Sequence, residues 1–306
     1  MQKAAARAID WSEQGLVPDT VIRHGIKRLL KKRLAGFNTG DCEATADQKA
    51  DFIQSMHASP IAPLPFKANE QHYELPTEFF LKVLGSQNKY SCCHWSDGVS
   101  DLDGAETEAL RITCERAGLR DGMKILELGC GWGSLTLWMA RHYPNSHITA
   151  SSNSTSQREY ILRRAHQLQL SNIVIQTCDM NDFVSENTYH RIVSVEMFEH
   201  MRNYHALFNR INTWLEPDGR FFMHIFCHRD TAYAFEEKDE TDWMSRHFFT
   251  GGMMPSDDLP LHFQQHLACI RHWRWDGSHY EKTANAWLQN MDDSKQVLWS
   301  VLEQTY

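Results

Sequence analysis

The sequence predicts an α/β fold built on a mostly parallel, doubly wound sheet. From Asp121 onward, short apolar segments alternate with segments that have helical spacing. Strands that alternate with helices in this way form parallel sheets whose two faces are covered by the helices. A second observation is the cluster Gly129, Gly131 and Gly133 between the first predicted strand and the helix after it. Glycines at this point let the chain turn sharply off a strand and approach a ligand closely.

The predicted strands are short, and small or polar residues follow them. They are Lys124–Leu128, His147–Ser151, Ile173–Thr177, Arg191–Val195 and Arg220–Phe226. The predicted helices between them are Leu135–His142, Gln157–Gln169 and Tyr204–Trp214. Pro217-Asp218-Gly219 predicts a turn that leads into the fifth strand. Ligands of such sheets bind beyond the carboxyl ends of the strands, so functional residues are expected directly after each one.

Residues 1–88 are predicted to form a helical N-terminal extension, and residues 89–306 the domain that contains the sheet. Between Thr20 and Leu34, apolar residues recur at helical spacing among six Lys and Arg residues. A basic amphipathic helix can lie on an anionic membrane. We favour the simpler interpretation, a helix that packs on its own protein with a solvated basic face. Pro76 to Leu84 is predicted to be a short helix.

Composition and charge argue against several classes of protein. The 306 residues are 42% apolar, enough for a substantial core, and the net charge of -8 argues against a nucleic-acid partner. The sequence has no apolar run long enough to span a membrane, and scattered charges in the first 30 residues argue against a secretory signal. Cysteines and histidines lack metal-ligand spacing. We therefore expect reduced thiols, a cytoplasmic location and no metal.

The segment Ile125 to Gly133 reads Ile-Leu-Glu-Leu-Gly-Cys-Gly-Trp-Gly and predicts a binding site for S-adenosylmethionine (SAM). A dinucleotide loop is expected as Gly-x-Gly-x-x-Gly, whereas these glycines stand at alternate positions. Glu127, two residues before Gly129, also suits SAM better than a dinucleotide. The loop residues Gly129, Cys130, Gly131 and Gly133 are therefore candidate cofactor contacts, with a plain structural turn as the alternative.

Polar residues follow the second and third predicted strands. Ser152, Asn153 and Gln157 could bond the ribose hydroxyls of SAM, although Ser and Asn at this point also suit a helix N-cap. Asp179 could accept a hydrogen bond from the adenine amino group while Met180 packs on the ring, with capping again as the alternative.

Two carboxylates and an imidazole follow the fourth predicted strand, in the run Glu196-Met197-Phe198-Glu199-His200. Such a group is costly at a strand end unless it is solvated, paired or functional. Methyl transfer needs a nucleophile with a free lone pair, and an aliphatic amine of pKa ~10 is almost fully protonated at neutral pH. A carboxylate–histidine set can hold an ammonium and then take its proton. We predict catalytic roles for Glu196, Glu199 and His200, with a surface salt-bridge cluster as the alternative.

Three motifs together resemble the cyclopropane fatty-acid synthase superfamily, in particular its coclaurine-type plant alkaloid N-methyltransferases. They are Tyr90-Ser91-Cys92-Cys93-His94-Trp95, the glycine loop and Phe198-Glu199-His200, and the likeness spans residues 70–300. It implies a class I SAM-methyltransferase (Rossmann-like) fold with seven strands and a helical lid insertion at about 229–262. It also implies that Tyr90 and Ser91 meet the methionine end of SAM, with the glycine loop, Ser152, Asn153 and Gln157 along the rest.

Two activities within this superfamily must be separated. The lipid enzymes methylate a double bond and use bicarbonate as a base, and the resemblance maps that bicarbonate cage onto Cys92, Glu199, His224 and Tyr280. Glu196 stands where the lipid enzymes usually carry a small residue such as glycine and the plant N-methyltransferases carry Glu. An added carboxylate favours a cationic amine. We therefore expect an N-methyltransferase of a small aromatic amine, with Tyr280 and His224 lining its pocket, and keep a bicarbonate-dependent lipid cyclopropane synthase as the alternative.

The end of the chain departs from the family pattern. Helical spacing runs from Ala284 to Tyr306, where the resemblance implies a further helix and a final strand. We expect a shortened form whose sheet lacks that strand and exposes an edge. This makes an inactive SAM-binding or scaffold protein a third alternative. A homodimer and contact with a membrane surface stay open, and the latter is not favoured.

Overall fold

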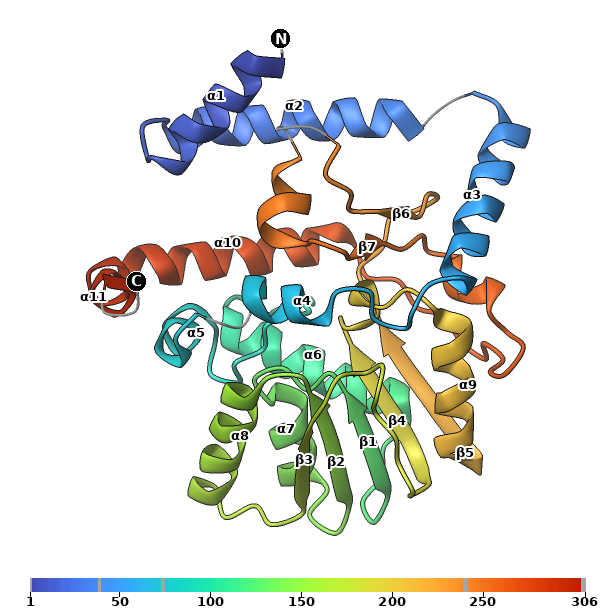
Figure 1. Ribbon diagram of the computed structural model, residues 1–306. Helices are drawn as coiled ribbons and strands as arrows, with labels where there is room; N and C mark the ends of the chain where they lie inside the picture. Colours follow the sequence, from blue (N-terminus) through green and yellow to red (C-terminus); the bar gives the residue numbers. More distant parts are fainter. Residues whose placement is uncertain (1, 38–39, 73–74, 239–241, 304–306) are drawn as a thin grey trace.

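The computed structural model describes residues 2–37, 40–72, 75–238 and 242–303, and its main sheet has five parallel strands (Figure 1). The strand order is β3-β2-β1-β4-β5, and every neighbouring pair is parallel. The strands are β1 (Lys124–Leu128), β2 (His147–Ser152), β3 (Ile173–Thr177), β4 (Tyr189–Val195) and β5 (Leu215–His224). The order reverses between β1 and β4, which is where sheets of this kind bind ligands. The predicted α/β class is confirmed.

Helices cover both faces of the sheet, because successive strand residues point to opposite sides. Ile125 and Ile148 pack with α6 (Leu102–Ala117) and α7 (Ser134–His142) on one face, whereas Leu126, Leu128 and Ile192 pack with α9 (Tyr204–Trp214) on the other. The helices around the sheet are α6, α7, α8 (Thr155–Gln167) and α9. The three helices predicted between the strands are confirmed, and α6 was not predicted.

The turn predicted at Pro217-Asp218-Gly219 is wrong, because these residues lie within β5. Tyr189 of β4 pairs with Leu215 of β5, and Arg191 pairs with Arg220. Residues 216–219 of β5 therefore lie opposite the single β4 residue between these two pairs. The extra residues form a bulge, which bends a strand without ending it. A Cβ at Gly219 would lie 2.8 Å from the carbonyl oxygen of Glu216, which explains the glycine.

The N-terminal extension is helical, as predicted. It comprises α1 (Gln2–Glu13), α2 (Asp19–Phe37), α3 (Cys42–His57), α4 (Pro65–His72) and α5 (Thr77–Val83). On α5, the Phe80 ring packs against the Trp132 ring at 4.7 Å, so the end of the extension shares the core of the sheet domain. The boundary between residues 88 and 89 stays a prediction.

The interpretation that α2 packs on its own protein holds only in part, because α2 contacts the lid insertion but has no buried residue. Leu30 and Leu34 are 55% and 54% exposed. The α1–α2 pair lies across the lid insertion (Figure 1). It is joined to the lid by polar and aromatic contacts, including Trp243 Nε1 to Glu13 at 2.7 Å and the rings of Phe37 and Tyr233 at 4.9 Å. These contacts leave the apolar stripe of α2 uncovered.

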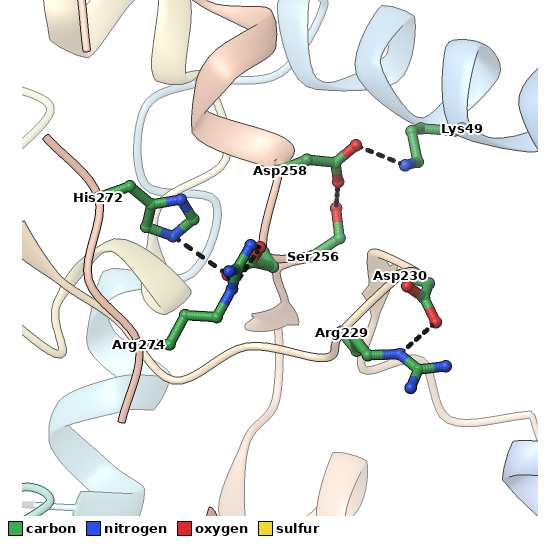
Figure 2. Close-up of polar contacts among 8 residues, drawn as sticks. Lys49, Arg229, Asp230, Ser256, Asp258, His272 and Arg274 are labelled. Atoms are coloured by element: carbon green, nitrogen blue, oxygen red, sulfur yellow. Dashed lines mark hydrogen bonds and ion pairs between the residues drawn. The ribbon is translucent and has the colours of Figure 1, made fainter. Parts of the chain in front are cut away.

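The lid insertion is less helical than predicted. Its described residues hold two short paired strands, β6 (Tyr233–Ala234) and β7 (Met253–Met254), and two short helical turns, η2 (Met244–Phe248) and η3 (Leu259–His262). Ion pairs fix its far end to neighbouring segments (Figure 2). Asp258 accepts a hydrogen bond from Lys49 of α3 at 2.7 Å, and Asp257 pairs with Arg274 at 2.6 Å. Tertiary contacts rather than helix periodicity therefore hold this segment.

The C-terminal helical pattern is confirmed within the described residues as α10 (Gly277–Asp293) and α11 (Lys295–Glu303). Of the seven strands that the resemblance implies, the described residues contain five in the main sheet, with β5 at one edge. In the same part of the chain, none of the helices is both long and apolar enough to cross a bilayer.

A wholly buried glutamate on α6 anchors the segment that leads toward the sheet edge. Glu106 accepts hydrogen bonds from the backbone N–H groups of Gly85, Gln87 and Lys89 at 3.0, 2.7 and 3.1 Å. Burial raises the pKa of Glu106 to about 7, although these bonds act in the opposite direction.

The pKa of Glu106 predicts a pH-dependent stability. The folded protein holds the proton more tightly than the unfolded chain does, so this group stabilises the fold less as the pH rises from about 4.5 to about 7. Glu106→Gln lacks this titration. We expect this variant to be less stable than the parent protein, because it loses hydrogen bonds at every pH. Its deficit in unfolding free energy should be about 2 kcal/mol smaller at pH 7.5 than at pH 5. Urea unfolding at both pH values measures this, and a difference independent of pH would contradict it.

Candidate active site

A cavity lies beyond the carboxyl ends of β1, β2 and β4, with about 1200 Å³ of space including its opening to solvent. The lid contributes Thr250, Gly251 and Gly252 to its wall. The predicted cofactor residues that line it are Tyr90, Ser91, Glu127, Gly129, Cys130, Gly131, Ser152, Asn153, Gln157 and Met180. Glu196 and His200 line it as well. The structure thus brings the glycine loop and the acid–imidazole run to one cavity.

The three glycines of the loop serve different purposes, although all have positive φ (+79°, +51° and +79°). A Cβ at Gly129 would lie 2.8 Å from Met197, and a Cβ at Gly133 would lie 2.5 Å from Ile161 of α8. A Cβ at Gly131 would meet no atom within 4 Å, and this residue faces the cavity. Gly133 therefore permits packing of the loop on α8, whereas Gly131 leaves the cavity wall open.

Gly133→Ala is expected to destabilise the fold by about 2–5 kcal/mol, since left-handed strain and overpacking against Ile161 add together. Gly122→Ala is the matched control, because Gly122 also has positive φ but no atom within 4 Å of its Cβ position. It should lose about 1–2 kcal/mol from strain alone. Urea unfolding compares the two variants, and equal losses would show that the Ile161 contact has no effect.

Buried polar groups without a protein partner surround the cavity. Trp132 Nε1, Ser134 Oγ and Gln157 Nε2 are enclosed, have no hydrogen-bond partner among the described residues, and belong to residues that line it. Buried polar groups are nearly always satisfied, so such a cluster indicates a polar ligand or water. The Glu127 carboxylate is also buried there and accepts a hydrogen bond from Thr136, while burial raises its pKa to about 7. The ribose and amino-acid groups of SAM suit this set.

The segment after β2 caps α8 and also lines the cavity, whereas its contact with the ribose of SAM stays a prediction. Ser154 is the N-cap of α8, while Ser152 Oγ donates to Gln157 Oε1 at 2.7 Å. This bond leaves the amide nitrogen of Gln157 for a ligand. Asp179 and Gly133 are not among the residues that line the cavity. Asp179 Oδ1 accepts from the backbone N–H of Asn181 at 2.8 Å, and its contact with adenine stays a prediction.

Glu196 follows β4 directly and is held by two donors. Its Oε1 accepts from the backbone N–H of Cys92 at 2.9 Å, and its Oε2 accepts from the Tyr280 hydroxyl at 3.1 Å. Its φ of +49° lies in a region that side chains other than glycine rarely adopt. Such backbone strain of about 1–3 kcal/mol tends to occur at functional sites. Burial raises the pKa of Glu196.

Glu199 and His200 lie on η1 (Phe198–His200), the short turn after Glu196. Glu199 is fully buried, and its Oε1 accepts from the backbone N–H of Phe226 at 2.6 Å, while its Oε2 is enclosed and has no hydrogen-bond partner in the described part of the chain. Burial and then the nearby Glu196 charge raise the pKa of Glu199 well above its usual value. The His200 ring stacks on Phe249 of the lid at 4.5 Å. A buried and a half-buried carboxylate at one place favour a bound cation.

Three of the predicted catalytic residues contact Glu196 but do not line the cavity: Cys92, His224 and Tyr280. Cys92 and Tyr280 bind the Glu196 carboxylate, and the His224 carbonyl accepts from the Glu196 N–H at 2.8 Å. Burial lowers the pKa of His224 to about 3, so its ring is neutral at physiological pH. These residues position Glu196 in the structure, whereas the sequence suggested that Tyr280 and His224 line the pocket.

Several residues of the cavity wall were missed by sequence reasoning. They are Ala62, Leu64, Pro65, Asn88, Lys89, Leu110, Thr113, Trp132, Ser134, Leu135, Ser151, Cys178, Val195, Met197, Met201, Thr250, Gly251 and Gly252. Lys89 is charged and buried, and it stands directly before the Tyr90-Ser91 motif, a position that could have drawn attention to it. The family resemblance implied a lid but assigned no cavity contact to Thr250, Gly251 or Gly252, and the 62–65 segment gave no local signal.

Comparison with known proteins agrees with this geometry. The family model for mycolic acid cyclopropane synthetase matches residues 64–306. The chain is 37% identical to (S)-coclaurine N-methyltransferase of Thalictrum flavum subsp. glaucum, over 94% of this chain and 80% of that protein. The crystal structure of coclaurine N-methyltransferase bound to N-methylheliamine and SAH is 34% identical and superposes with a TM-score of 0.92, over 96% of this chain and 85% of that one.

A lipid enzyme of the same group is more distant. Cyclopropane-fatty-acyl-phospholipid synthase of Escherichia coli (strain K12) is 29% identical, over 72% of this chain and 55% of that protein. This chain is therefore similar to both the amine and the lipid enzymes over most of its length. On the strength of the family match and the 37% identity, this chain belongs to the mycolic acid cyclopropane synthetase family of class I SAM-dependent methyltransferases.

Proposed function

We propose that this chain is a SAM-dependent N-methyltransferase of a small, alkaloid-like aromatic amine. The observation that carries the proposal is the Glu196 carboxylate, fixed by the Cys92 N–H and the Tyr280 hydroxyl in the wall of the cavity that contains the glycine loop. A carboxylate held in this way attracts an ammonium. It gives no comparable advantage to an uncharged alkene.

The residues divide into those that hold the methyl donor and those that hold the amine. Bound SAM supplies a methyl group on a positively charged sulfur. The glycine loop, Glu127, Ser152 and Gln157 would hold it at the ends of β1 and β2. Glu196 orients the incoming ammonium on the β4 side of the same cavity. This placement brings donor and acceptor together, and alignment of this kind can supply a large share of a rate enhancement.

The amine must lose a proton before its nitrogen has a lone pair. We propose that Glu199 and His200 act together as the general base. His200 lines the cavity, and Glu199 is buried beside Glu196. Burial raises the pKa of Glu199, which brings a carboxylate closer to the range useful for a base at neutral pH. The lid residues Thr250 to Gly252 would limit access of water to this position.

The relatives support an amine rather than a lipid acceptor. Identity is 37% to the coclaurine enzyme across nearly the whole chain, against 29% to the phospholipid enzyme across a shorter part. The bicarbonate cage suggested by resemblance would use Glu199, His224, Cys92 and Tyr280. In this structure the Cys92 N–H and the Tyr280 hydroxyl bind Glu196 instead. A cytoplasmic location and a homodimer stay predictions.

Mass spectrometry with labelled SAM tests the function. The purified chain is incubated with a mixed panel of benzylisoquinoline-type amines and phospholipid vesicles, with and without bicarbonate. We expect the label in an amine, independent of bicarbonate. Label in phospholipid that requires bicarbonate would establish the cyclopropane synthase instead. Calorimetric binding of SAH without label in any product would favour the inactive SAM-binding protein.

A further inference from the structure

Lys89 is a buried cation in the wall of the cavity. It does not belong to the predicted catalytic residues. It is 3% exposed, and its Nζ donates to Ser91 Oγ at 2.6 Å and to the Cys92 carbonyl at 2.7 Å. Its backbone N–H is fixed by Glu106 at 3.1 Å. A lysine is almost never fully buried unless it is paired, so this position calls for a reason.

The backbone of Cys92 connects Lys89 to Glu196. The carbonyl of Cys92 accepts from the Lys89 ammonium, and the N–H of the same residue donates to the Glu196 carboxylate at 2.9 Å. Opposite charges therefore bind the two polar groups of one residue. Ser91, the other acceptor of Lys89, lines the cavity on the predicted cofactor side. Lys89 is thus in a position to influence both halves of the site.

We propose that Lys89 is a positioning residue for amine recognition, whose buried positive charge keeps Glu196 ionised and holds the Tyr90–Cys92 segment against it. The inference rests on the proposed function, because it assigns to Glu196 the task of attracting an ammonium. Two neighbouring carboxylates that are partly or wholly shielded from water would take up a proton if no cation lay nearby. A protonated Glu196 would lose its attraction for the substrate.

The Lys89 charge and the two hydrogen bonds to the Glu196 carboxylate all lower the pKa of Glu196. Burial raises the pKa of Glu196, and the Lys89 charge is the largest influence that lowers it again. The bonds from the Cys92 N–H and the Tyr280 hydroxyl lower it further. The ionisable groups near Glu196 on the surrounding elements are Lys89, Tyr90, Cys92, Cys93, Glu199, Tyr280 and the neutral His224. Lys89 is the cation in this set, so its removal should raise the pKa of Glu196.

The pH profile of kcat/KM for the methylated amine tests the proposal. In Lys89→Met and Lys89→Gln, we expect the acidic limb to move up by about one pH unit or more, with kcat/KM at pH 7 reduced about 10- to 100-fold. Gln keeps an N–H donor for Ser91 and Cys92 but removes the charge, so it separates charge from hydrogen bonding. Lys89→Arg keeps the charge and should leave the limb near its original pH. Lys49→Met is the matched control, since it breaks the Lys49–Asp258 pair outside the cavity wall and should not move the limb.

A double-mutant cycle distinguishes action through Glu196 from a general structural effect. On a Glu196→Gln background, Lys89→Met should cost less than about threefold in kcat/KM, because the two residues act as one unit. Additive losses would overturn the proposal. So would an unmoved acidic limb in the Gln and Met variants when circular dichroism and thermal unfolding show them folded. Absence of any amine turnover by the parent protein would instead reject the proposed function.

Discussion

Replacing Glu196 with Gln is expected to lower kcat/KM for the amine by about 10²- to 10³-fold, mainly through KM. The variant keeps the shape of the side chain and can still accept from the Cys92 N–H, but it removes the negative charge that would meet the ammonium. SAH affinity, measured by calorimetry, should change little, because the glycine loop, Glu127, Ser152 and Gln157 lie at the ends of β1 and β2, away from the Glu196 carboxylate's two donors.

The matched control for this prediction is Glu108→Gln. Glu108 pairs with Arg111 at 2.8 Å on an exposed part of α6, outside the cavity lining, and its loss should leave KM unchanged. An unchanged KM in Glu196→Gln would remove Glu196 from amine recognition. Loss of SAH binding in the same variant would show a structural role that reaches the cofactor side.

Glu199→Gln and His200→Ala should each reduce kcat by about 10²- to 10⁴-fold at pH 7, the usual contribution of an acid–base group. The expected cause is failure to take the proton from the bound ammonium. The loss should therefore shrink as the pH approaches the pKa of the amine, because more substrate then arrives with a free lone pair. Initial rates at saturating amine from pH 7 to pH 10 measure this recovery.

His142→Ala provides the control for His200→Ala. The His142 ring also stacks on an aromatic ring, that of Trp138 at 3.9 Å, but it lies at the end of α7 and not among the residues that line the cavity. Its kcat should match that of the parent protein. A deficit in the Glu199 and His200 variants that is the same at every pH would argue against proton removal and for positioning.

Local sequence patterns predicted most of the sheet and the location of the site. The apolar segments that became β1, β2 and β3 were placed within one residue, because buried strands of a parallel sheet need apolar residues locally. The glycine loop and the run from Glu196 to His200 were expected at the same sheet edge, and both contribute to one cavity. The prediction failed at Pro217-Asp218-Gly219, since a bulge and a turn use the same residues and only pairing with β4 distinguishes them.

The sequence by itself determined the α/β class, the glycine bend and the chemical character of the residues after β4. Tertiary structure decided what those residues do. Gly133 is required by Ile161, which follows much later in the chain, and Glu196 is fixed by Cys92 and by Tyr280 from α10. The physical reason is that strand and turn preferences act between near neighbours. Burial and charge pairing depend on which distant segments come into contact, and local sequence patterns do not predict those contacts.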